Sequence, residues 1–194
     1  NNNGWISLGQ SSLTPSVDIA STSSYTALTS TATNTPTLLR NRVAGFARDL
    51  QGQTGSEIRV ETIGTAPNRI CVVQWTNYKR FGTTGTGDAV NFQIRLFETS
   101  NYVQIMYGTC TFGTTSSTGT NVGLGGTTAT DYNNRTSTTS WLATTAGTTN
   151  AQGITVSSAI TAPTSGMYFI WGTMAATPPT PVQAGGTPTC SAGT

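Results

Sequence analysis

Apolar and polar residues alternate in two neighbouring segments of the chain, residues 90–97 and 103–107. The apolar positions are Val90, Phe92, Ile94, Leu96, Val103, Ile105 and Tyr107. Because successive side chains of a β-strand point to opposite faces, this period of two places the apolar side chains on one face of each strand. The polar break at residues 98–101 is short enough for a tight turn. The two segments therefore predict an antiparallel hairpin with one buried face.

Strand patterns also occur in residues 5–8, 41–50, 56–63, 69–75, 121–126, 153–160 and 167–171. In residues 56–63, Ile58, Val60 and Thr62 alternate with charged residues, which predicts a half-buried strand with one apolar and one charged face. The glycines of residues 121–126 favour a β-bulge or a close backbone approach. The apolar run at residues 167–171 favours a buried closing strand.

Turn signals separate these segments. Residues 49–52 and 66–68 are predicted turns, residues 81–88 form a glycine-threonine loop, and the polar residues 131–147 are predicted to be loop-like. No segment predicts a helix. The pattern predicts an all-β fold, an antiparallel, jelly-roll-like β-sandwich of about eight or nine strands.

Composition agrees with this fold class. Threonine is the most frequent residue, 22 residues are glycine and only 8% are charged. This balance favours strands and turns over helices. We expect a β-sandwich domain over residues 1–174, with its first strands missing. Residues 175–194 are rich in Pro, Gly and Thr and show no periodicity, which predicts an extended linker.

Charge and hydropathy exclude two classes of partner. The net charge is +2 and the nine Lys and Arg form no basic run, so we expect no nucleic acid. No apolar stretch approaches the roughly 20 residues that cross a bilayer, so we expect no membrane span. A surface of Thr, Ser, Asn and Gly suits an extracellular or cell-surface protein.

The cysteines and the N-terminus predict a piece of a longer protein. Three cysteines cannot all pair with one another. Cys71 is in phase with Val73 and Trp75, which predicts a buried thiol, and Cys190 lies in the tail, where its partner would lie beyond this chain. The chain also begins with a strand that no earlier strand can pair with. We therefore expect an open sheet edge at which another chain adds a strand.

The residues that most hydrolases need are missing. The chain has no His, which excludes Ser-His-Asp and Cys-His catalysis and His-ligated zinc. Lys79 is the only lysine and no Ser precedes it in an S-x-x-K pattern. Glu57 and Glu61 share one face of a strand, but roughly 13 Å separates them at about 3.3 Å per residue, too far for a glycosidase. We expect no enzyme activity and no cofactor.

The acidic residues do not predict a metal site. No D-x-D-x-D-G calcium loop is present, and Asp49, Asp88 and Asp131 lie apart from one another in the sequence. Each is therefore predicted to be a turn residue.

Several stretches resemble a known family: NNNGWISLG, APNRICVVQWTNYKRFG, NFQIRLFETSNYVQIMYG, NVGLGG, DYNNRTSTTSWLATTAG and PTSGMYFIWG. In order and spacing they are similar to the β-sandwich domains of adhesin-like secreted and surface proteins of Bacteroidetes, which commonly use type IX secretion. The resemblance implies a surface location and a following immunoglobulin-like repeat, with Cys190 as its first cysteine. Arg48 departs from the family, in which a pair of adjacent aspartates often begins at this position, so a metal role for Asp49 is not expected.

One stretch carries the residue types that bind sugars. These are Asp131, Tyr132, Asn133, Asn134, Arg135 and Trp141. An aromatic ring can stack on a sugar, and amide or charged groups can bind its hydroxyls. The alternative is structural, with Trp141 capping the sandwich core and the Asx residues building turns. A weaker aromatic set is Trp75, Tyr78 and Phe81, because Trp75 is in phase with the core.

Two functions fit these observations. The first is a non-catalytic structural or adhesive module of a secreted or surface-displayed bacterial protein, a candidate part of an extracellular filament. Its partners would be other surface proteins, glycans or copies of itself. The alternative is a carbohydrate-binding module of a secreted multidomain protein. Binding to glycans separates the two.

Overall fold

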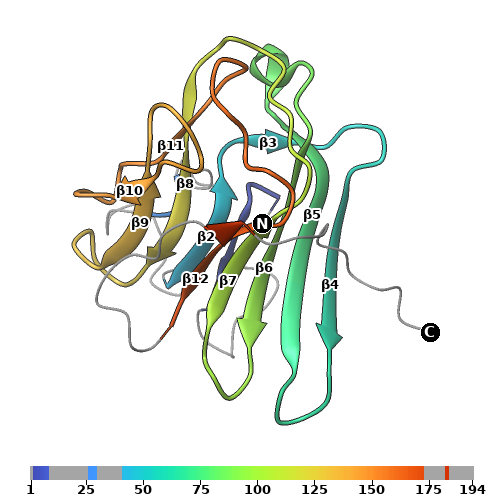
Figure 1. Ribbon diagram of the computed structural model, residues 1–194, viewed down its shortest axis with the longest axis vertical. Coiled ribbons are helices and arrows are strands. Elements are labelled where there is room, and N and C mark those ends of the chain that lie inside the picture. Colours follow the sequence, from blue (N-terminus) through green and yellow to red (C-terminus); the bar gives the residue numbers. More distant parts are fainter. Residues whose placement is uncertain (1, 9–25, 30–40, 173–181, 184–194) are drawn as a thin grey trace, which may run out of the picture.

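The computed structural model describes residues 2–8, 26–29, 41–172 and 182–183. Within these residues, thirteen strands form two antiparallel sheets, joined by loops that include one short 3-10 helix, η2 (Gly82–Gly85). The sheets pack face to face, with β9 and β10 at one side of Figure 1 and β4 and β5 at the other. No helix in the described part of the chain is long and apolar enough to span a membrane. The predicted all-β sandwich is confirmed.

The smaller sheet has six strands. Its order is β1 (Trp5–Ser7), β2 (Arg42–Ala47), β8 (Thr118–Gly125), β9 (Tyr132–Thr136) and β10 (Thr145–Ala146), and β11 (Ile154–Val156) also pairs with β8.

The larger sheet has seven strands. Its order is β13 (Val182–Gln183), β12 (Met167–Trp171), β7 (Val103–Tyr107), β6 (Val90–Phe97), β5 (Ile70–Arg80) and β3 (Leu50–Gln51). The seventh strand, β4 (Glu57–Ile63), also pairs with β5. β3 and β4 therefore divide the length of β5: β3 pairs with its C-terminal end and β4 with residues 70–76.

The hairpin predicted from residues 90–107 is confirmed. β6 and β7 pair antiparallel, with Ile94 opposite Ile105. Their turn contains Thr99 and Asn101, both with positive φ. The apolar face of the hairpin is buried except near the turn, where Leu96 is half-buried.

Aromatic rings fill the core between the sheets. Phe46 stacks on Trp141 with ring centroids 5.7 Å apart and lies 6.3 Å from Phe92. Tyr107 meets Trp141 edge-on at 5.0 Å, and its hydroxyl donates a 2.6 Å hydrogen bond to the carbonyl of Gly45. These large rings bury much apolar surface in a small space, which stabilises the sandwich.

A β-bulge in β2 turns Phe46 into this core. The backbone N–H groups of Gly45 and Phe46 both donate to the carbonyl of Gly4, at 3.0 and 3.2 Å. Two residues facing one is the pattern of a bulge, which changes the direction of the following side chain. Phe46 therefore joins the main core, whereas Ala44 lies in a separate buried cluster with Trp5.

Glycine allows β8 and β9 to approach closely. Gly123 has φ +141°, and a Cβ on this residue would lie 2.4 Å from the carbonyl oxygen of Asn133. Only glycine fits such a contact without a shift of the backbone. The close backbone approach predicted for residues 121–126 is confirmed.

A buried ion pair lies near η2, and its arginine also donates a hydrogen bond to the smaller sheet. Arg80 and Asp88 form two charge-assisted hydrogen bonds, 2.6 Å from Nε to Oδ2 and 2.9 Å from Nη2 to Oδ1. Nη1 of Arg80 also donates to the carbonyls of Ser116 and Val156, at 2.7 and 3.0 Å. Asp88 was expected only as a turn residue. Asp88 pairs with Arg80 because β5 ends at Arg80, and the fold brings this end of the strand next to Asp88.

Three sequence-based expectations differ from the structure. The described residues form thirteen strands, whereas about eight or nine were expected. Several of these strands are only two or three residues long, shorter than a typical strand. Residues 50–51, expected in a turn, form β3, and residues 132–136, expected in a loop, form β9. The expected linker, residues 175–194, lies outside the described residues except for β13, which pairs with β12.

Candidate functional site

Trp141, the predicted stacking residue for a sugar, lies in the core and is fully buried. Its ring is packed between Phe46, Tyr107 and Phe112. A ring in this position presents no face to a ligand. Of the two interpretations of Trp141, the structure shows the structural one, and the prediction of a sugar platform at Trp141 is wrong.

Asn134 and Arg135 are buried on β9 and bind the segments beside it. Nδ2 of Asn134 donates to the carbonyls of Thr149 (3.1 Å) and Gln152 (2.9 Å). Nε of Arg135 donates to the hydroxyl of Thr144 (3.1 Å), and Nη2 donates to its carbonyl. Burial lowers the pKa of Arg135. These side chains use their hydrogen bonds to hold the chain that follows β9.

The other three predicted residues reach solvent to different degrees. Asp131 is exposed, and its carboxylate accepts the backbone N–H of Thr127 at 3.2 Å, as a turn residue does. Asn133 is half-buried and accepts the indole N–H of Trp171 at 3.0 Å. Tyr132 is also half-buried. The six predicted residues therefore do not form one exposed surface.

The weaker aromatic set is not brought together either. Trp75 is buried and stacks on Phe92 with ring centroids 4.7 Å apart. Tyr78 is half-buried, and Phe81 is exposed in the loop that follows β5. The prediction that Trp75 belongs to the core is confirmed.

A different surface is open on the larger sheet. The strand register places one row of side chains on the inner face, from β4 to β12: Val60, Val73, Ile94, Ile105 and Phe169. Val60 is 66% exposed, Val73 is 9% exposed and the rest of the row is fully buried. The neighbouring row begins at Ile58, which is 39% exposed. The smaller sheet therefore covers the inner face up to β5 but not β4.

We call the uncovered inner-face residues at this side of the sheet the open strip: Ile58, Val60, Thr62, Cys71 and Leu96. The apolar face of β4 was expected to be buried, and this expectation is wrong for Ile58 and Val60. The expectation of a buried thiol at Cys71 is also wrong, because Cys71 is half-buried beside the uncovered strand.

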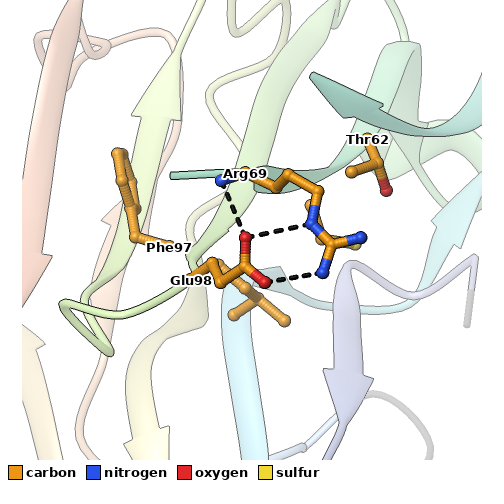
Figure 2. A pocket seen from close by; sticks show the side chains of 6 residues that line it. Thr62, Arg69, Phe97 and Glu98 are labelled. Atoms are coloured by element: carbon orange, nitrogen blue, oxygen red, sulfur yellow. Dashed lines mark hydrogen bonds and ion pairs between the residues drawn. The ribbon is translucent and has the colours of Figure 1, made fainter. Parts of the chain in front are cut away.

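A pocket lies at one end of the open strip, where the β4–β5 and β6–β7 turns meet. We call it the rim pocket. Its volume is about 340 Å³, and it is lined by Thr62, Arg69, Cys71, Leu96, Phe97 and Glu98. Figure 2 shows the guanidinium of Arg69 between Glu98 and Thr62, whereas Phe97 points away from this pair. The volume is at the lower end of the range for small-ligand sites.

An ion pair fixes the rim of this pocket. Nε and Nη2 of Arg69 donate to the two carboxylate oxygens of Glu98, at 2.9 and 2.6 Å, and the backbone N–H of Arg69 donates to the same carboxylate at 3.0 Å. The hydrogen bonds from the side chain and backbone of Arg69 lower the pKa of Glu98 to about 2. Nη1 of Arg69 makes no hydrogen bond within the described residues, so it can donate to a ligand.

This surface combines three features that suit the binding of another polypeptide. The open strip offers apolar side chains, the rim pocket offers a guanidinium N–H, and β4 is an outer strand whose second edge pairs with no described strand. An outer strand and an adjacent apolar face together favour binding of an extended chain.

Sequence alternation could not reveal this surface. It shows which residues share a face, but it does not show how far the opposite sheet reaches. One available signal was the charge on the other face of β4, from Glu57, Arg59 and Glu61. Charges of this kind are typical of edge strands.

The comparisons with known proteins give a family. A family model described as NIDO related matches residues 1–173, which include both sheets apart from β13 and all of the open strip. No curated protein and no solved structure matched the chain. The resemblance to surface proteins of Bacteroidetes stays a prediction.

Proposed function

The chain belongs to the NIDO-related family, and on this premise we propose that it is a non-catalytic structural or adhesive module of a secreted or surface-displayed protein. Its open strip and rim pocket hold the surface of another protein. The observation that carries this proposal is the exposure of Val60, 66%, at the end of a row of side chains that is buried elsewhere.

Exposed apolar side chains on a rigid sheet favour binding to a partner. Val60 is more exposed than any other large hydrophobic residue in the described part of the chain. Burying apolar surface against a partner is favourable, and a strand held by seven register pairs to β5 loses little freedom on binding. Adjacent exposed apolar residues on a soluble domain commonly mark contact sites.

The sequence supports the non-catalytic and extracellular parts of the proposal. The absence of His removes the side chain that most often transfers protons near neutral pH. The surface chemistry rests on hydroxyls and amides, since only 8% of residues are charged.

An adhesion assay tests the proposed binding surface. Cells that display the chain are compared with cells that display Val60→Lys, for attachment to surfaces and to one another. Leu142→Lys is the matched control, because Leu142 is also exposed but lies outside the open strip. We expect Val60→Lys alone to reduce attachment. Equal attachment of all three would contradict the proposal.

The proposed location is tested separately. Intact cells of the source organism are treated with protease, and released peptides are identified by mass spectrometry. Peptides from residues 41–172 should appear without cell lysis. Their appearance only after lysis would refute a surface role.

Carbohydrate binding remains the alternative function, but fewer of the predicted residues are accessible to a sugar. Asp131 is exposed and lies next to the half-buried Tyr132. A glycan array with the wild-type chain and the Tyr132→Ala variant tests it. Binding that Tyr132→Ala removes would favour this alternative, and an array with no signal would exclude it for the glycans used.

A further inference from the structure

The strand β4, whose second edge pairs with no described strand, carries a charge pattern that is complementary to itself. Along β4 the outward side chains are Glu57, Arg59 and Glu61, and the inner-face side chains are Ile58, Val60 and Thr62. Val60 is the middle residue of this seven-residue strand. Figure 1 shows β4 as the outermost strand of its sheet, on the side away from β9 and β10.

We propose that β4 pairs antiparallel with β4 of a second copy of this chain, around a two-fold axis at Val60. This register uses the whole strand. It places Arg59 of each copy opposite Glu61 of the other, so two opposite-charge pairs form on the outer face. On the inner face Val60 lies opposite Val60, and Ile58 lies opposite Thr62.

Other symmetric registers are less favourable. An axis at Arg59 places Arg59 opposite Arg59 and Glu57 opposite Glu61, and an axis at Glu61 places two Glu61 side chains together. Like charges directly opposite one another destabilise a strand pair. An axis at Ile58 pairs Glu57 with Arg59 but leaves the second half of β4 outside the ladder. Charged residues on an edge strand often prevent it from pairing with another chain. On β4 the charges instead favour one register, the one with its two-fold axis at Val60.

The exposed apolar side chains and the charges of β4 both favour a second copy of the chain as the partner. Val60 and Ile58 are exposed in one copy, and the two-fold arrangement places the apolar rows of both copies side by side, which removes this surface from water. Glu61 is half-buried and has no ion-pair partner within the described residues, and its buried carboxylate oxygen Oε2 makes no hydrogen bond there. Arg59 contacts Glu57 of its own strand at 3.0 Å in an exposed pair, which leaves it able to reach the second copy.

This inference rests on the proposed function, because it names a copy of the chain as one partner of the open strip. Sedimentation equilibrium of the full chain, with no other protein present, tests it apart from the adhesion assay. We expect a monomer–dimer equilibrium that Val60→Lys abolishes. Arg59→Glu and Glu61→Arg should each weaken the dimer by at least about tenfold, because each places like charges together twice.

Mixing provides the decisive control. Arg59→Glu and Glu61→Arg in equal amounts should form a mixed dimer, since every facing pair then has opposite charges. The Arg48→Glu control makes the same charge change on a residue of the loop between β2 and β3, and it should dimerise like the wild type. Circular dichroism checks that each variant folds.

Cross-linking tests the register itself. In a chain that also carries Cys71→Ser and Cys190→Ser, Val60→Cys should form a disulfide-linked dimer on mild oxidation, because facing residues of an antiparallel pair have adjacent Cβ atoms. Glu57→Cys should not, because Glu57 faces Ile63 of the second copy.

Two results would overturn the proposal. One is a wild-type chain that stays monomeric at about 1 mM, where even weak interfaces associate. The other is a dimer that neither Val60→Lys nor the charge reversals affect, since it must use another surface. In either case, if Val60→Lys reduces adhesion, the proposed function is still supported, and the open strip binds a partner other than a second copy of the chain.

Discussion

Ion pairs in this chain differ in burial, and they therefore differ in what they contribute to stability. Arg80 and Asp88 are almost completely buried, whereas Arg59 and Glu57 are exposed. Asp88→Asn leaves the Arg80 charge buried without its partner, which costs about 3–5 kcal/mol. Glu57→Gln should change the free energy of unfolding by about 1 kcal/mol or less. Urea unfolding of both variants checks this contrast, and equal effects would contradict it.

The Glu98 carboxylate makes stability depend on acid pH. Its pKa in the folded chain is lowered from 4.5 to about 2, first of all by the side-chain hydrogen bonds from Arg69. A depressed pKa contributes stability above the unfolded value, and this contribution is lost as the pH falls through the folded value. The wild type should therefore lose stability relative to Glu98→Gln between pH 4.5 and about 2.

The measurement is the free energy of unfolding as a function of pH for both chains. Arg69→Gln is the control, because it removes the cause of the shift and should abolish most of the difference. A wild type and a Glu98→Gln variant with parallel pH curves would rule out the ion pair as the source of acid sensitivity.

The described cysteines should differ in reactivity. Burial raises the pKa of Cys110 to about 12, so few thiolate groups form near neutral pH. Cys71 is half-buried and lines the rim pocket. Iodoacetamide should label Cys71 at least about tenfold faster than Cys110 in the native chain. Peptide mass spectrometry assigns the label to each site, and faster labelling of Cys110 would mean that the core opens there.

At the scale of the strand, the contact of β8 with β9 depends on glycine at one position. Gly123→Ala adds a Cβ 2.4 Å from a backbone oxygen at φ +141°, so it should destabilise the fold by about 1–3 kcal/mol. Gly119 on the same strand has open space around its Cα and is the matched control. Gly119→Ala should change stability by about 0.5 kcal/mol or less. Thermal unfolding of both variants checks the difference, and similar effects would argue against the close approach.

Strands with a clear alternation could be predicted from the sequence, and polar strands could not. The β6–β7 hairpin and the buried β12 follow from their apolar positions. β9 has the sequence YNNRT, which resembles a loop because its buried side chains, Asn134 and Arg135, are polar. Their burial depends on hydrogen bonds to Thr144, Thr149 and Gln152, which no local pattern shows.

At the scale of the whole molecule, the candidate site depends on how the two sheets overlap. The alternation of β4 correctly placed Ile58 and Val60 on its inner face, but their exposure results from the smaller sheet ending before β4. Trp141 was the opposite case: its polar surroundings in sequence suggested a ligand site, and the fold places it among the core rings. Sequence therefore gives the face of a residue, and the packing of the sheets decides whether that face is open.

The proposed binding surface depends on one row of side chains that leads from the core to an open surface. Maleimide labelling of Val60→Cys and Val73→Cys, each in a chain with Cys71→Ser and Cys190→Ser at low protein concentration, tests it directly. The two residues face each other across β4 and β5. We predict rapid labelling of Val60→Cys and protection of Val73→Cys. Equal protection of both would mean that β4 is covered, and the open strip would not exist.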